Sequence, residues 1–70
     1  MAARDDRAAL RAAVDKLPQD LRAVVVLTEL SDLTYPQIGE ALSIPAGTVG
    51  SRRNRALKRL REILEKPGDD

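Results

Sequence analysis

The stretch that decides the fold of this chain is residues 45–61, PAGTVGSRRNRALKRLR. Pro45 suits the first turn of a helix, where its missing N–H would have no partner anyway. Gly47, Thr48 and Ser51 follow, and each is small enough to let another molecule approach the backbone. Six basic residues then come within ten positions. The stretch therefore predicts a helix that opens in a tight turn and carries positive charge.

This helix divides into two faces at a period of about 3.6 residues. The inward stripe consists of Val49, Ala56, Leu60 and Ile63 or Leu64, with Leu57 at its margin. The opposite face presents Gly47, Ser51, Asn54 and Lys58. Arg52 or Arg53 falls on the inward side, where its aliphatic stem can cover the seam while the charged head reaches outward. We expect Lys66, Pro67 and Gly68 to end the helix.

Positive charge is concentrated in the same region. The net charge is only +1, but residues 45–66 hold seven of the twelve Lys and Arg and only two of the eleven Asp and Glu. Such a segment is typical of a nucleic-acid-binding face. On charge alone, a solvated helix face is the competing interpretation.

The composition excludes several classes of protein. Cysteine and histidine are absent, which removes disulfide frameworks, Cys/His zinc fingers and the commonest general base. Tyr35 is the only aromatic residue, so the core must be aliphatic, and single-strand binding by base stacking is disfavoured. No apolar run approaches the ~20 residues that span a bilayer. We therefore expect one small cytoplasmic domain that contacts no membrane, binds no metal or cofactor and is not an enzyme.

Three further helices are expected before residue 45. Residues 7–16 have apolar positions at helical spacing, with Asp5 and Asp6 as caps. Pro18 is expected in the first turn of a second helix that reaches about residue 30 and is buried on more than one side. Thr34 and Gln37 match a capping box for a short third helix that reaches about residue 42.

The third and fourth helices are expected to cross steeply. Only Ser43 and Ile44 separate the third helix from Pro45, and Gly39 in mid-helix indicates a close approach. We also expect Leu33 to turn inward before the third helix. The prediction is a compact all-α domain of four helices with a C-terminal helix-turn-helix, over residues 5–66. Residues 1–4 would be a disordered N-terminus and residues 67–70 an acidic tail.

A basic helix that begins in a tight turn suits the major groove of double-stranded DNA. Arginine can form two hydrogen bonds to guanine, and Asn54 can form hydrogen bonds to adenine. Lys58 and Arg59 lie further along the helix and are expected to bind phosphates. The start of the third helix would lie across the DNA backbone. For Thr34 a simple capping role, and for Tyr35 a packing role, are equally good interpretations.

At this point the chain resembles a known family. Leu17-Pro18 with Arg22 ahead of an aliphatic run, followed by LTYPQIGEALSIPAGTVGSRRNRALKRLRE at residues 33–62, resembles the fourth conserved region of bacterial sigma factors. The extracytoplasmic-function (ECF) group is the most similar, and the GTV-x-SR-x-x-RA portion at residues 47–56 is the most specific. Gly50, Arg53, Gly39 and Ser43 depart from the family pattern, which commonly has a basic residue, an aliphatic residue, alanine and glycine there.

The resemblance implies binding to the −35 element of promoters as part of an alternative sigma factor that directs RNA polymerase. It implies docking on the β flap of the polymerase core, and an anti-sigma factor is a candidate partner. The residues implied to read bases are Ser51, Arg52, Asn54 and Arg55. Those assigned to the DNA backbone are Thr34, Tyr35, Gln37, Thr48, Arg53, Lys58 and Arg59.

Two alternatives stay open on the sequence alone. One is the helix-turn-helix of another small regulator, such as a response regulator or repressor, for which a dimer would be expected; a monomer is the simpler expectation here. The other is a helical protein-interaction domain whose basic helix is bound by an anti-sigma factor or by the polymerase flap.

Overall fold

The computed structural model describes the backbone of residues 2–65 and the side chains of residues 7–65. Its helices are α1 (Ala2–Asp15), α2 (Gln19–Leu30), α3 (Tyr35–Leu42) and α4 (Ala46–Leu64). Over this range the secondary structure is helical without strands, so the predicted all-α fold of four helices is confirmed. None of the helices in the described range is long and apolar enough to cross a membrane.

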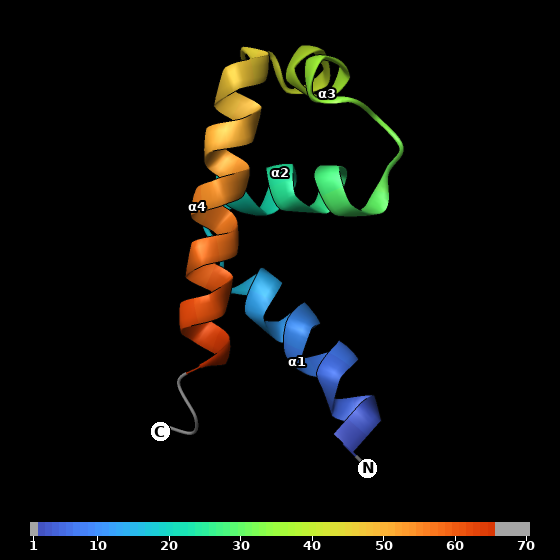
Figure 1. Ribbon diagram of the computed structural model, residues 1–70, viewed down its shortest axis with the longest axis vertical. Coiled ribbons are helices and arrows are strands. Elements are labelled where there is room, and N and C mark those ends of the chain that lie inside the picture. The colour runs from blue at the N-terminus through green and yellow to red at the C-terminus, as the bar shows by residue number, and fades with distance from the viewer. Residues whose placement is uncertain (1, 66–70) are drawn as a thin grey trace.

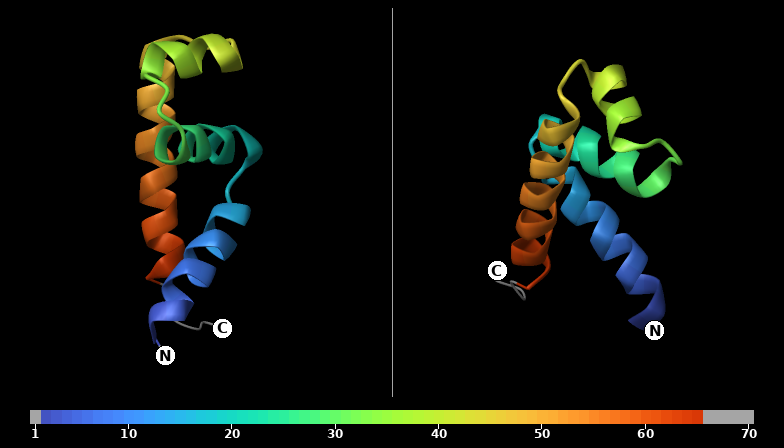
Figure 2. Two further views of the ribbon diagram at one scale, coloured as in Figure 1. Left: turned by 90° about the vertical axis from the view of Figure 1, so that its right-hand side faces the viewer. Right: turned by 45° about the horizontal axis from the view of Figure 1, so that its top comes forward.

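Helix α4 is the element against which the others are assembled. It contacts α1, α2 and α3, whereas among the other three helices the main contact is that of α2 with α3. Figure 1 shows α4 running along one side of the molecule, with α3 beside its start, α2 across its middle and α1 beside its later turns. The views of Figure 2 show the same order, and the right-hand view shows α1 diverging from α4 toward its own N-terminus.

The core is aliphatic, as the composition requires, and it consists of two clusters. The first joins α1, α2 and α4 through Ala13, Leu17, Leu21, Val25, Ala56 and Leu60. The second joins α2, α3 and α4 through Val24, Ile38 and Val49, which are fully buried. The inward stripe predicted for α4 is confirmed at Val49, Ala56 and Leu60.

The valine run of α2 contributes to both clusters. Val24 packs with Ile38 and Val49 on the α3 side, while Val25 packs with the α1 side of the core. Neighbouring residues of a helix point about 100° apart, so adjacent valines can face different partners. The prediction of a helix buried on more than one side is therefore confirmed.

A tight turn of residues 43–45 joins α3 to α4. Ser43 adopts the left-handed conformation (φ 62°, ψ 43°). The Ile44 N–H donates to the Gly39 carbonyl at 2.8 Å, and the Ser43 N–H donates to that of Glu40 at 3.3 Å. These bonds make a Schellman motif, which satisfies carbonyls at the end of α3 and turns the chain sharply into α4.

Gly39 makes the predicted close approach. A Cβ atom added there would lie 2.5 Å from the Ile44 carbonyl oxygen and 3.3 Å from the Ala46 amide nitrogen. The glycine therefore lets α3 lie directly against the backbone of the turn and the first residue of α4.

The expected helix starts differ from the structure at three places. Helix α1 begins at Ala2 rather than at residue 7, so Asp5 and Asp6 lie within the helix and do not cap it. Pro18 and Pro45 precede their helices as N-cap residues with extended ψ angles of 152° and 151°, outside the first turn. Their carbonyls accept from Arg22 N–H at 2.9 Å and Val49 N–H at 3.1 Å, as N-cap carbonyls do.

Two further predictions concern the loop before α3 and the end of α4. Leu33 was expected to turn inward, but it is 41% exposed, and the cluster of Val24, Ile38 and Val49 is completed by Leu27, Leu42 and Ile44 instead. Helix α4 ends at Leu64 with Glu65 as its C-cap. The predicted stop at residues 66–68 and the acidic tail at residues 67–70 lie outside the described residues.

We expect Gly39→Ala to lower the free energy of unfolding by about 1–3 kcal/mol, because the added methyl overlaps a backbone oxygen that cannot easily move. Denaturant unfolding followed by circular dichroism measures the change. Gly47→Ala is the matched control, since nothing lies within 4 Å of a Cβ at that position. Equal stability of the two variants would contradict the close approach.

We expect Ser43→Gly to raise the free energy of unfolding by about 0.5–1 kcal/mol. A residue with a Cβ atom in the left-handed region destabilises the folded chain by about 1–2 kcal/mol, and glycine removes this cost. Glycine also makes the unfolded chain more flexible, which offsets part of the gain. Thermal or denaturant unfolding tests this. Ser43→Ala retains the Cβ atom and should bring no gain; an equal gain would mean that the backbone conformation is not the cause.

Candidate nucleic-acid interface

The outer face of α4 lies opposite the stripe that contacts the core. Ser51, Asn54, Arg55 and Lys58 are exposed on it. They are three or four residues apart, which places them side by side along one face. The structure thus brings together three of the four predicted base-reading residues with the predicted phosphate contact Lys58.

Arg52 and Thr48 lie at one edge of this outer face and are half-buried. Arg52 lines an open hollow together with Asp20 at the start of α2 and Leu42 at the end of α3. Arg59 is exposed about one turn beyond Arg55 and three turns beyond Thr48. Arg52 is therefore closer to the start of α2 than the other base-reading candidates are.

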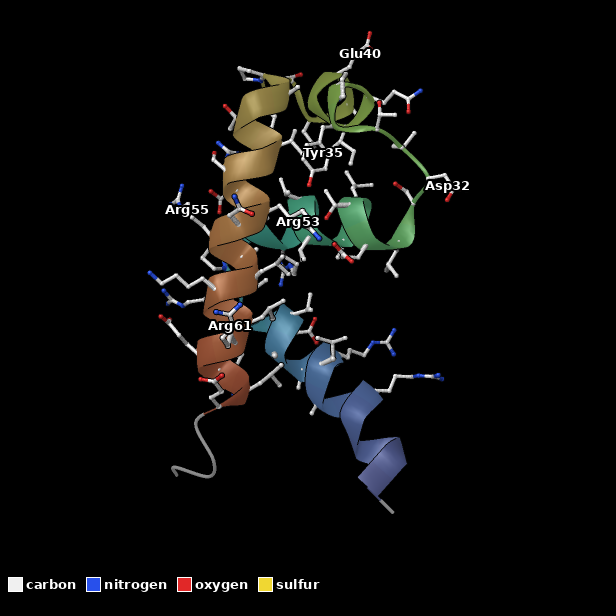
Figure 3. All side chains as sticks on the ribbon, viewed as in Figure 1. Asp32, Tyr35, Glu40, Arg53, Arg55 and Arg61 are labelled. Carbon is white, nitrogen blue, oxygen red and sulfur yellow. The ribbon has the colours of Figure 1, made fainter. Side chains whose placement is uncertain are left out.

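Arg53 lies at the other edge and points toward α2. Its Nε and Nη2 atoms each lie 3.0 Å from Oε2 of Glu29. Hydrogen bonding to Glu29 raises the pKa of Arg53 above its ordinary value, and the nearby Tyr35 raises it further. Figure 3 shows Arg53 directed toward α2 and Arg55 on the other side of α4.

The start of α3 has the predicted capping box. Thr34 Oγ1 accepts from the Gln37 N–H at 3.2 Å, and Gln37 Oε1 accepts from the Thr34 N–H at 2.8 Å. Both residues are exposed. Their oxygens are thus engaged in the cap, while the Thr34 hydroxyl hydrogen and the Gln37 amide NH2 are donor groups that the cap does not use.

Tyr35, the first residue of α3, lies against α4. A Cβ atom built on Gly50 would be 3.4 Å from Cε2 of the Tyr35 ring, an ordinary packing distance. Tyr35 as a whole is 39% exposed. This contact sets the start of α3 beside the first turns of α4, so the predicted packing role of Tyr35 is present.

Charge on the described side chains is strongly segregated. Helix α4 carries six Arg and Lys and one acid, Glu62, whereas α2 and α3 carry Asp20, Glu29 and Glu40 with Arg22 as the only base. A face with this excess of positive charge attracts a polyanion. Glu29 was missed by the sequence reasoning, although an arginine on the inward side of α4 was a signal that an acidic partner was needed.

Two helices joined by a tight turn, the second with an exposed basic face, define a helix-turn-helix domain of the nucleic-acid-binding class. The chain matches the family described as sigma-70, region 4 over residues 7–60, and it belongs to that family. This is not a family of enzymes. The resemblance to the fourth conserved region of sigma factors is therefore confirmed.

Several relatives bear the names of ECF sigma factors. The chain is 46% identical over 57 residues to the ECF RNA polymerase sigma factor SigE of Mycolicibacterium smegmatis, covering 81% of this chain and 22% of that protein. It is 45% identical over 49 residues to the ECF RNA polymerase sigma factor SigW of Bacillus subtilis, covering 70% and 26%. The RNA polymerase sigma-E factor of Streptomyces antibioticus is 45% identical over 60 residues, covering 86% and 33%.

The chain thus spans between about a fifth and a third of the length of these relatives. No solved structure matches it. The similarity to ECF sigma factors therefore concerns one region of proteins that are several times longer.

We expect Thr34→Ala to lower the free energy of unfolding by about 1 kcal/mol, because the Gln37 N–H loses its side-chain acceptor. Chemical denaturation measures this. Thr34→Ser retains the hydroxyl and should keep most of the stability. If Thr34→Ser loses as much as Thr34→Ala, the methyl group rather than the cap is what matters.

Proposed function

We propose that this domain binds the −35 element of promoters in double-stranded DNA, as part of an alternative sigma factor that directs RNA polymerase in transcription initiation. The observation that carries the proposal is the exposed basic face of α4, presented by the helix-turn-helix of a chain that belongs to the sigma-70 region 4 family. A helix of this kind fits the major groove, which is wide enough to admit it.

In this proposal the two ends of α4 have different tasks. Ser51, Arg52, Asn54 and Arg55 read base edges, since they lie within the first turns that enter the groove. Lys58 and Arg59 hold phosphates, which adds affinity but no sequence information. Thr48 lies at the edge of the reading face and meets the backbone.

The start of α3 is proposed to meet a neighbouring phosphate through Thr34, Tyr35 and Gln37. Donor groups remain on Thr34 and Gln37 beyond the cap, and the first turn of a helix favours an anion. Thr34→Asp separates this role from capping. It preserves an acceptor for the Gln37 N–H, so stability should hold, while its negative charge should weaken DNA binding.

The partners are proposed to be promoter DNA and the β flap of the RNA polymerase core, with an anti-sigma factor as a regulator. The domain would act in the cytoplasm as a monomer, without cofactor or catalysis. A protein-interaction role has its own support, because Leu30 at the end of α2 is 80% exposed and Leu33 follows it in an exposed loop. The domain could bind DNA and a protein at the same time, since these leucines are on α2 and the loop after it, whereas the DNA-binding face is on α4.

We expect Arg55→Ala and Lys58→Ala to weaken DNA binding in different ways. A duplex selected by the wild-type chain from a randomised pool is titrated against a scrambled duplex at two salt concentrations. Arg55→Ala should cost about 1–3 kcal/mol of discrimination between the duplexes. Lys58→Ala should weaken binding to both equally and reduce the dependence of log K on log salt by about 0.9.

Arg11→Ala is the matched control, because it removes the same charge from an exposed position on α1. It should leave the discrimination between duplexes unchanged. If the wild-type chain enriches no duplex from the pool even at low salt, the proposal of direct DNA binding by this domain is wrong, and the protein-interaction role is then tested by capture with the polymerase β flap.

A further inference from the structure

Residues from three helices meet on one side of α4. Glu29 comes from the last turn of α2, Tyr35 from the first residue of α3, and Arg53 from the second turn of α4. Two nitrogens of Arg53 share one oxygen of Glu29 at 3.0 Å. Figure 3 shows Tyr35 and Arg53 on the same side of α4, in the space bordered by α2 and α3.

The Tyr35 ring lies against the backbone of α4 at Gly50, on the side of the helix where Arg53 lies. Gly50 and Arg53 are three residues apart, so they lie on the same edge of the helix. The ring covers Gly50 at packing distance, and the phenol is near enough to Arg53 to influence its titration. The ring therefore has a glycine beneath it and a charged pair beside it.

We infer that Arg53 is a positioning residue and not the DNA backbone contact that its place in a basic helix predicts. With Glu29 it fixes α4 to the end of α2 and retains the Tyr35 ring over Gly50, which sets the spacing between the start of α3 and the reading face of α4. This inference rests on the proposed function, in which α3 and α4 contact the same DNA.

The geometry of the guanidinium supports this assignment. A free arginine offers a phosphate two parallel N–H groups. In Arg53 the Nε and Nη2 edge is already directed at Glu29, so without breaking these contacts a phosphate could use only the Nη1/Nη2 end of the guanidinium. The carboxylate also neutralises the positive charge locally, so Arg53 adds less to the field at the outer face than Arg55, which lies across the helix from it.

The spacing that this cluster controls matters for recognition. Helix α3 touches α4 through the buried Ile38 and Val49, and through Tyr35 at the surface. Gly39 and the turn fix the later half of α3 against α4, and the Tyr35 contact fixes its start. Two points of contact fix the distance between a backbone-binding helix start and a base-reading face.

The first test uses the 70-residue chain without DNA. Tyr35 is its only aromatic residue, so near-ultraviolet circular dichroism reports on that ring alone. We expect Arg53→Ala and Glu29→Ala each to diminish the tyrosine signal while far-ultraviolet helicity persists. Arg61→Ala removes the same charge from an exposed position of the same helix and should leave the signal unchanged. An unchanged signal in Arg53→Ala would overturn the inference.

The second test uses the selected duplex described above. Arg53→Ala should weaken binding about twofold to fivefold, the range expected when a partly exposed ion pair is lost, with the salt dependence of the wild type. Glu29→Ala should also weaken binding, although it removes a negative charge. A fall in salt dependence of about 0.9 in Arg53→Ala, as expected for Lys58→Ala, would instead identify a phosphate contact and overturn the inference.

Exchange of the charges gives the sharpest comparison. Arg53→Glu alone places two carboxylates together and should weaken binding and the tyrosine signal; adding Glu29→Arg should restore both. A phosphate contact could not be restored in this way, because the acid would remain on α4. If the wild-type chain enriches no duplex from the pool, the proposed function fails, while the tyrosine signal of the exchanged pair still decides whether Arg53 positions Tyr35.

Discussion

The contact of Val24, Ile38 and Val49 is the interaction on which the rest of the structure depends. These fully buried side chains come from α2, α3 and α4, and they bring the two helices of the helix-turn-helix onto a common support. With no Phe or Trp in the chain, burial must come from branched aliphatic groups that fill space only at short range. Close backbone approach is therefore a requirement, and it is met where Gly39 lies against the Ile44 carbonyl.

Most of the fold could be predicted because its signals are local. The capping box of Thr34 and Gln37, the glycine at position 39 and the apolar period of α4 all act within a few residues, and each has the predicted role. The positions that differ depend on tertiary context. Whether Leu33 turns inward is decided by how much space the core leaves, and the start of α1 depends on how far an alanine-rich segment extends beyond its contacts with α4.

The candidate site divides in the same way. Periodicity places Ser51, Asn54 and Arg55 on the outer face, and they are exposed there. The helical period cannot assign different roles to Arg52 and Arg53, because both border the inward stripe. Their roles differ because different residues surround them. Arg52 borders Asp20 and Arg53 pairs with Glu29, and no sequence spacing reveals which acid on α2 lies beside which arginine. The base contact assigned to Arg52 stays a prediction.

The division of the core into two clusters has a consequence for how such a domain can vary. Only α2 and α4 contribute buried residues to both clusters, whereas α1 contributes to one and α3 to the other. Substitutions in separate parts of a core usually act independently on stability. Substitutions in the cluster that includes α1 can therefore change thermal stability. The cluster that sets the angle of α3 on α4 is left intact by such changes. Stability and target choice become separately adjustable properties of one short chain.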